Sequence, residues 1–120
     1  MKGRPKRVVP SRKSMKAVER ILLEMDRSPD AFPDFVVVLP FDPPFLSSVF
    51  TEERLRLWAE LRRATPKSIT DVAEKLDRNV SRVRQDLLIL EGAGLAKLRK
   101  RGRTVEATSD ALHILIPSPA

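Results

Sequence analysis

The sequence contains no cysteine, and this absence excludes disulfide bonds and cysteine-ligated metal sites. It also agrees with a cytoplasmic location, because disulfides belong mainly to oxidising compartments. No apolar run approaches the roughly 20 residues that a membrane-spanning helix needs. The basic start of the chain is followed by no long apolar segment of the kind found in secretory signals. We therefore expect a protein without a membrane span or a secretory signal.

Patterns that mark catalytic sites are missing as well. The sequence has no glycine-rich phosphate-binding loop, no nucleophile–histidine set and no paired-carboxylate motif. We predict that the chain is not an enzyme, that it has no catalytic or metal-binding residues and that it uses no cofactor. The single histidine, His113, lies in an apolar segment, and we interpret it as a packed side chain. A length of 120 residues suits one compact domain with short appendages.

Positive charge is concentrated in two short segments. The net charge is +7, and residues 1–16 and 97–103 contain many lysines and arginines but none of the sixteen acidic residues. A solvated surface does not need such segregation, whereas a protein that binds a polyanion does. The pattern therefore favours nucleic acid as a partner.

The first ten residues contain two prolines, one glycine and four cations, a composition that cannot form a core. We predict a flexible basic arm over residues 1–10 that contacts phosphates without reading sequence. Its cations are Lys2, Arg4, Lys6 and Arg7. The segment Lys2–Pro5 also resembles the core of an AT-hook, although a lysine replaces the first arginine of that motif.

A helix is predicted from Thr51 to about Arg63. Thr51 is a good N-cap, and the two glutamates that follow it lie where the helix dipole favours negative charge. The expected core face consists of Leu55, Leu57, Trp58 and Leu61. The expected solvated residues are Arg56, Glu60 and Arg63.

Two further helices are predicted after this one, joined by a tight turn. Ser68–Ile69 fits a very short strand, and Thr70 is the expected cap of a helix over Asp71–Leu76. Its inward residues are Ile69, Val72, Ala73 and Leu76. The small Ala73 allows two helices to approach closely, as a helix-turn-helix requires at their crossing.

Asp77–Arg78 is the predicted turn, and Asn79 is the expected cap of a second helix from Val80 to about Gly92. At about 100° per residue, its core stripe consists of Val80, Val83, Leu87 and Leu90. The opposite face carries side chains that can hydrogen-bond to base edges in a major groove. The predicted base-reading residues are Arg78, Asn79, Ser81, Arg82 and Gln85. Arg84 lies nearer the flank and suits a phosphate.

A basic hairpin is predicted after the second helix. Gly94 ends the helix in a left-handed conformation, and Leu95–Lys100 alternates as a strand does. Arg101–Arg103 forms a tight turn, from which Thr104–Thr108 returns. The cations expected to face the DNA backbone or an adjacent groove are Lys97, Arg99, Lys100, Arg101 and Arg103.

The stretch SITDVAEKLDRNVSRVRQDLLILEGAGLAKLRKRGR resembles the winged helix-turn-helix predicted transcriptional regulators of prokaryotes, in the broad MarR/ArsR-like group. The resemblance covers about Thr51–Thr108. It implies a three-helix core with a β-wing, a homodimer and the binding of double-stranded operator DNA. The metal ligands of ArsR-like proteins have no counterpart, because the chain has no cysteine and one histidine.

Residues 11–50 do not match the usual pattern of that group. An apolar helical stripe predicts a helix over Ser11–Arg27, with Met15, Val18, Leu22 and Met25 on one face. Phe35–Leu39 predicts a strand covered on both faces. Because a chain of this length has little material to cover that strand, we predict that Met15–Leu39 contributes to a homodimer interface.

The predicted fold is mainly α with a small β-wing. A flexible arm at 1–10 precedes a helix and strand extension at 11–50 and a winged helix-turn-helix DNA-binding domain at 51–116. Ser109–Ile116 fits a helix or a strand, and we favour a strand that closes against the core. The predicted protein is a homodimeric, sequence-specific regulator that binds double-stranded DNA in the cytoplasm and is associated with the nucleoid.

Two alternatives involve a protein partner. The winged helix could bind an acidic protein through its wing, or the chain could be a DNA-binding antitoxin that masks a partner protein. Binding of RNA or of single-stranded nucleic acid is disfavoured, because there is no tyrosine and the phenylalanines lie in apolar or proline-rich contexts.

Overall fold

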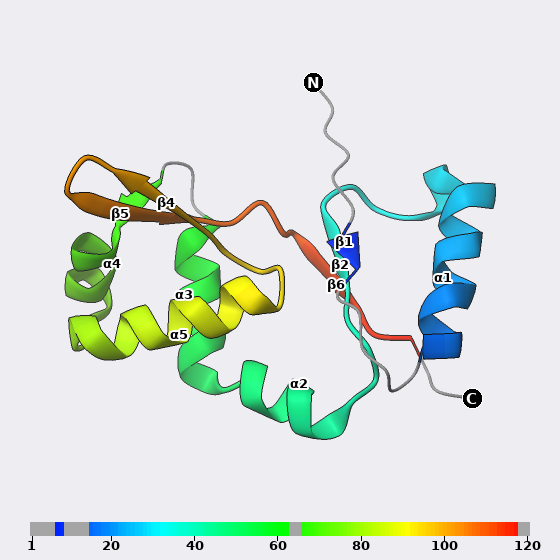
Figure 1. Ribbon diagram of the computed structural model, residues 1–120, viewed down its shortest axis with the longest axis horizontal. Coiled ribbons are helices and arrows are strands. Elements are labelled where there is room, and N and C mark those ends of the chain that lie inside the picture. Colours follow the sequence, from blue (N-terminus) through cyan, green and yellow to red (C-terminus); the bar gives the residue numbers. More distant parts are fainter. Residues whose placement is uncertain (1–6, 9–14, 63–65, 118–120) are drawn as a thin grey trace. The chain divides into compact units, whose positions relative to one another are not determined.

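The computed structural model of this chain describes residues 7–8, 15–62 and 66–117 (Figure 1). The chain divides into two compact units, one formed by Met1–Leu46 with Ala111–Ala120 and the other by Ser47–Asp110. This division differs from the predicted DNA-binding domain at 51–116, because residues 111–116 belong to the first unit. No helix among the described residues is long and apolar enough to cross a membrane.

The first unit contains a small parallel sheet. The strand β2 (Val36–Val38) lies between β1 (Arg7–Val8) and β6 (His113–Leu115) and pairs with both. All three valines of β2 are at most 2% exposed, so the prediction of a strand covered on both faces is confirmed. The premise that a second copy is needed to cover it is wrong, since β1 and β6 of the same chain occupy both edges.

The pairing of β1 and β6 revises two further predictions. Arg7 and Val8 form a strand, whereas residues 1–10 were expected to lack regular structure, and Lys2, Arg4 and Lys6 lie outside the described residues. The expected strand at the C-terminal end of the chain is confirmed, but its partner is β2. His113 is exposed, which contradicts its interpretation as a packed side chain.

The helix α1 (Met15–Arg27) ends where the sequence predicts, and Ser28 separates it from a 3₁₀ turn, η1 (Pro29–Ala31). Val18 and Met25 are buried, and Met25 packs in a core with Val36 and Val38 of β2. Leu22 was expected on the same stripe, yet it is 41% exposed. The predicted first turn at residues 11–14 lies outside the described residues.

The second unit contains the predicted helix after Thr51. This helix, α3 (Glu52–Leu61), follows α2 (Pro43–Val49), and the Thr51 hydroxyl accepts a hydrogen bond from the Arg54 N–H at 3.2 Å. The cap is thus confirmed, and Leu57 and Leu61 are buried as expected.

Three side chains of α3 depart from their predicted environments. Leu55 is 41% exposed, and Trp58 is only partly buried, with the Arg62 guanidinium 5.2 Å from its ring centre. Glu60 was expected in solvent, but it is 6% exposed. Its carboxylate lies 2.7 Å from Lys67 Nζ and 3.5 Å from Lys75 Nζ. These two cations compensate the burial of its charge.

The short strand β3 (Lys67–Ser68) leads into α4 (Ile69–Leu76). The cap of α4 is Ser68 and not Thr70, because the Ser68 hydroxyl accepts from the Asp71 N–H at 3.1 Å. The helix ends at Leu76, and its C-cap, Asp77, has the left-handed φ of 56° that a tight turn requires.

The next helix, α5 (Val80–Gly92), begins and ends at the predicted residues. It is followed by β4 (Lys97–Arg101) and β5 (Thr104–Thr108), an antiparallel hairpin. Positive φ angles at Gly94 (77°) and Gly102 (62°) permit the exit from α5 and the hairpin turn. The strand β3 pairs with β5, so the sheet order is β3-β5-β4. Figure 1 shows this hairpin beside the bundle of α3, α4 and α5.

Candidate nucleic-acid interface

The exposed face of α5 carries three of the predicted base-reading residues. Ser81, Arg82 and Gln85 are all exposed, while Val83, Leu87 and Leu90 on the opposite face are at most 1% exposed. The side chains of Arg82 and Gln85 make no hydrogen bond or ion pair with another residue in the described part of the chain. Donors and acceptors that can reach base edges are therefore available along the first half of α5.

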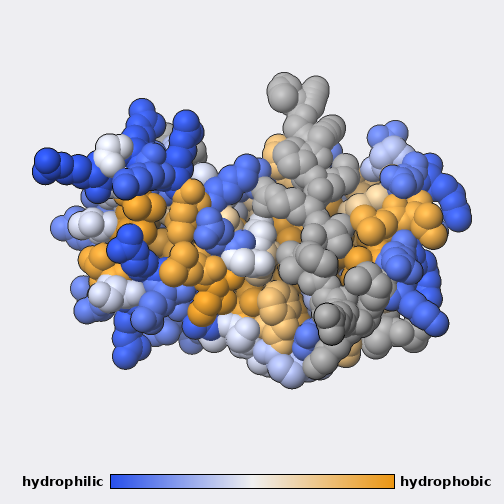
Figure 2. All heavy atoms as spheres, in the orientation of Figure 1, coloured by the Kyte–Doolittle hydropathy of each residue, from blue (hydrophilic) through white to orange (hydrophobic). Residues whose placement is uncertain are grey.

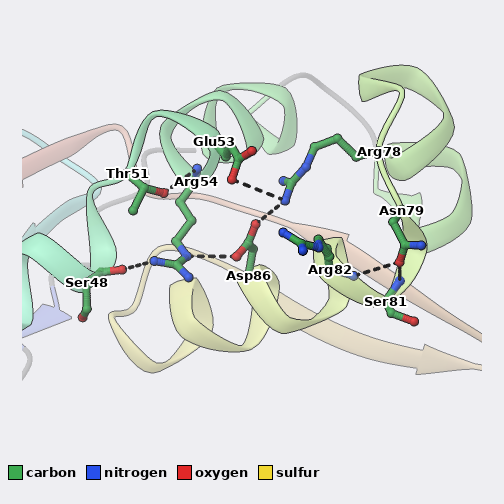
Figure 3. A network of polar contacts seen from close by, with 9 residues as sticks. All are labelled: Ser48, Thr51, Glu53, Arg54, Arg78, Asn79, Ser81, Arg82 and Asp86. Atoms are coloured by element: carbon green, nitrogen blue, oxygen red, sulfur yellow. Dashed lines mark hydrogen bonds and ion pairs between the residues drawn. The ribbon is translucent and has the colours of Figure 1, made fainter.

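Asn79 has a structural task at the start of this helix. Its side-chain oxygen accepts from the N–H groups of Ser81 at 2.8 Å and of Arg82 at 3.3 Å (Figure 3). These bonds satisfy two helix-start donors and fix the beginning of α5. The side chain is exposed, so its amide group faces solvent beside Ser81.

Arg78 does not present its guanidinium to solvent, although the sequence predicts it on the reading face. Its Nη2 lies 2.6 Å from Asp86 Oδ2, and its side chain is 17% exposed. Glu53 is a second acidic neighbour, at 4.0 Å. A guanidinium held in this way is not available for a base edge, so we exclude Arg78 from the candidate reading residues.

Asp86 is the residue that the sequence reasoning missed. It is 7% exposed and accepts from Arg78 and from Arg54 Nε, the latter at 3.0 Å. Arg54 also donates to the backbone oxygen of Ser48, so the network joins the end of α2, α3, the turn and α5 (Figure 3). A signal was present in the sequence, because an acid three residues after Val83 and four before Leu90 falls on the core stripe.

Val80 was predicted in the core, yet it is 44% exposed. As the first residue of α5 it lines a cleft between the start of α4, the start of α5 and the hairpin, together with Arg84, Arg103 and Thr104. The hairpin therefore borders the edge of α5 on which Val80 and Arg84 lie.

All five predicted cations of the hairpin are exposed. Lys97 Nζ lies 3.0 Å from Asp110 Oδ2, and Arg101 Nη1 lies 3.6 Å from Glu106 Oε1. Among the described residues, Arg99, Lys100 and Arg103 have no acidic partner. Figure 2 shows hydrophilic side chains gathered around this hairpin, and the exposed cations among them give it excess positive charge.

The second unit has three packed helices, with a tight turn between the last two and a β-hairpin after them. This arrangement defines a winged helix-turn-helix protein. The predicted fold class is therefore confirmed. The model of the HVO_A0114 family matches residues 49–114, and the chain belongs to this family. A comparison with curated proteins finds no match.

Solved structures similar to this chain include transcriptional regulators called HlyU. Reduced HlyU from Vibrio cholerae N16961 is 26% identical, with a TM-score of 0.48, over 56% of this chain and 70% of that chain. HlyU from Vibrio vulnificus CMCP6 is 23% identical, with a TM-score of 0.48, over 74% of this chain and 81% of that chain. The more specific resemblance to the MarR/ArsR-like group stays a prediction.

Proposed function

We infer that the protein is a transcriptional regulator that binds a specific sequence of double-stranded DNA. The observation that carries this proposal is the hydrogen-bonding face of α5 beside a hairpin of exposed cations. A helix of this kind can enter a major groove, while the hairpin contacts the backbone or an adjacent groove. Such a regulator would act in the cytoplasm, on the nucleoid.

The residues divide into two groups by what they contact. Asn79, Ser81, Arg82 and Gln85 read base edges, with Arg82 suited to guanine and Gln85 to adenine. The phosphate-contacting residues are Arg84, Lys97, Arg99, Lys100, Arg101 and Arg103. The last group makes binding strong and salt-dependent without specifying sequence. The salt-dependent attraction to DNA is increased further by the positive charges of Lys2, Arg4, Lys6 and Arg7.

A homodimer would place two reading helices on one duplex. The support for it is now the surface of α1, where Leu22 is 41% exposed and Leu23 59% exposed. The same helix carries both signs of charge, including Glu24 and Arg27, which form an ion pair at 3.7 Å. Two copies of the exposed leucine surface can pack against each other about a two-fold axis, which is the commonest symmetry of soluble oligomers.

The reading face is tested on a duplex selected by the wild-type protein from a random library. Arg82→Ala and Gln85→Ala should each weaken binding to the selected site by about 1–3 kcal/mol and leave binding to random duplex almost unchanged. Arg99→Ala, the control on the hairpin, should weaken both alike. Equal affinity of wild type and the two α5 variants for the selected site would disprove the assignment.

The salt dependence of binding tests whether the cations contact DNA phosphates. A protein that makes on the order of 6–10 phosphate contacts should lose about 10³–10⁵ in affinity between 50 and 200 mM salt. Affinity that changes by less than tenfold over this range would contradict the proposal.

Binding to a protein partner is the second candidate function, alone or combined with DNA binding as in an antitoxin. It is favoured by Leu88, which is 53% exposed on α5, and by the hydrophobic residues visible at the surface near that helix in Figure 2. Leu88→Ser separates the two functions, since it removes the apolar contact with the partner and adds no negative charge to the helix that is proposed to face DNA.

A further inference from the structure

The cleft between the hairpin and the helix-turn-helix has walls from three parts of the second unit. Arg84 and Val80 belong to α5, Ser68 and Thr70 to the start of α4, and Arg103 to the hairpin turn. Ile69, Thr104 and Val105 complete the lining. The volume is about 190 Å³, below the roughly 300–1,000 Å³ of sites for drug-sized ligands. The cleft therefore fits a single small group better than a metabolite.

The polar lining of this cleft is positive or uncharged. It contains two arginines and three hydroxyl groups but no acidic residue. Arg84 and Arg103 are both exposed, and neither has an acidic partner in the described part of the chain. Two of the hydroxyls have bonds within the protein: Ser68 Oγ accepts from the Asp71 N–H, and Thr104 Oγ1 donates to the Arg101 carbonyl. Thr70 is exposed and supplies a further donor.

A second cavity of the same unit provides a contrast. It measures about 330 Å³ and is lined by Glu52, Glu53, Arg56, Leu76 and Arg78. Each of its arginines faces an acid, since Arg56 lies 2.7 Å from Glu52 and Arg78 lies 4.0 Å from Glu53. Charge is balanced there, whereas the smaller cleft has two cations and no counter-charge.

We propose that the cleft between Arg84 and Arg103 binds one phosphodiester group of the duplex. Two guanidinium groups and a threonine hydroxyl match the oxygens of a phosphate, and Arg binds that group by paired hydrogen bonds. The bound phosphate bridges α5 and the hairpin turn, so it sets the depth at which the reading face enters the groove. This inference rests on the proposed function, because the ligand is part of the DNA that α5 reads.

The test uses the selected duplex with single uncharged methylphosphonate linkages placed at successive positions. For the wild-type protein, one linkage should weaken binding about tenfold, beyond the effects at neighbouring positions. Arg84→Gln and Arg103→Gln should each weaken binding to the unmodified duplex by a similar factor. On the duplex that carries the methylphosphonate at that one position, neither substitution should weaken binding further. The charged phosphate that both arginines contact is already absent from this duplex.

Arg56→Gln is the matched control, because it removes the same charge from the acid-balanced cavity. It should change affinity less than twofold, and its small effect should be the same at every methylphosphonate position. Circular dichroism and the unfolding midpoint check that the variants fold alike.

The results also separate this inference from the proposed function. If Arg82→Ala abolishes site preference while Arg84 and Arg103 respond to different phosphates or to none, the cleft proposal is overturned and the proposed function stands. A wild-type protein that binds no duplex overturns both. A third outcome would also overturn the cleft proposal. In it, inorganic phosphate shifts the amide signals of Thr70 and Thr104 saturably, while Arg84 and Arg103 respond to no common phosphate of the duplex. The cleft would then bind a free phosphate compound.

Discussion

At the scale of single residues, one buried carboxylate joins α5 to the turn before it and to α3. Asp86 accepts from Arg78 at 2.6 Å and from Arg54 at 3.0 Å, and both arginine side chains are at most 20% exposed. The carboxylate is the counter-charge that allows two cations to lie away from water. Because Arg78 belongs to the turn and Arg54 to α3, the three charges hold the turn and two helices together.

The substitution Asp86→Asn keeps the shape of the side chain but removes its charge. We expect it to lower the free energy of unfolding by about 3 kcal/mol, the low end for breaking a buried pair, because the two arginines retain some exposure. Urea denaturation followed by circular dichroism measures the change.

Glu91→Gln is the control, since Glu91 is an exposed acid near the end of the same helix. It should change the free energy of unfolding by less than about 0.5 kcal/mol. Equal stabilities of the Asp86 and Glu91 variants would show that the network contributes nothing beyond surface charge.

Residue environments were predictable from the sequence where apolar periodicity decides them. Val83, Leu87 and Leu90 are buried as their spacing predicts. The ion-pair partners of Glu60 and Asp86 were not predictable, even though Asp86 falls on the core stripe, because a charged side chain is buried only if a partner elsewhere in the fold compensates it. Glu60 depends on Lys67 and Lys75, and Asp86 on Arg54, 32 residues earlier in the chain. Nothing local identifies such partners.

At the scale of elements, α5 has one face that is buried and one that is exposed. Leu87 is 0% exposed, whereas its neighbour Leu88 is 53% exposed. One face completes the core of the second unit, and the other is exposed to solvent. The helix can thus be changed on one face with little effect on the other.

Leu87→Ala should lower the free energy of unfolding by about 2–5 kcal/mol, because it leaves a cavity in a closely packed core. Leu88→Ala makes the same chemical change on the exposed face and should stay within about 0.5 kcal/mol of wild type. Thermal unfolding of the two variants compares them directly. A loss for Leu88→Ala as large as that for Leu87→Ala would mean that this face is covered by a second molecule or element.

The element boundaries show how far capping signals determine a helix. Asn79 alone has a capping side chain next to the start of α5, and that helix begins at the predicted residue. At the start of α4, Ser68 and Thr70 both have hydroxyl groups that can cap a helix. The sequence predicts Thr70 as the cap, whereas the structure uses Ser68. Ser68 also pairs with Glu106 of β5, so a strand formed far along the chain fixes the start of the helix.

At the scale of the whole molecule, the sheet of the first unit joins opposite ends of the described chain. The strand β2 pairs with β1 near one end and with β6 near the other. This arrangement fills the hydrogen-bonding edges of β2 without a second copy. The proposed dimer therefore rests on the exposed leucines of α1.

We expect analytical ultracentrifugation of the wild-type protein at micromolar concentrations to give twice the monomer mass. The double substitution Leu22→Glu with Leu23→Glu should shift the mass to that of a monomer, because it places like charges in the apolar contact. A monomeric wild-type protein would contradict the proposed dimer.

Lys16→Glu is the control, since it changes the charge of an exposed residue on the same helix outside the leucine pair. It should leave the mass at twice that of the monomer. If the double variant stays dimeric, the dimer interface does not include the exposed leucines of α1.

By itself, the sequence determined the helix-turn-helix, the wing and the cap of α5, because periodicity, N-caps and glycine turns act over a few residues. The tertiary structure alone decided three things: that Arg78 pairs with Asp86, that Val80 faces a cleft and that β6 joins β2. Each of these depends on which distant segments meet in space. This ion pair, this cleft and this strand pairing are made by such meetings, and no local pattern of residues encodes them.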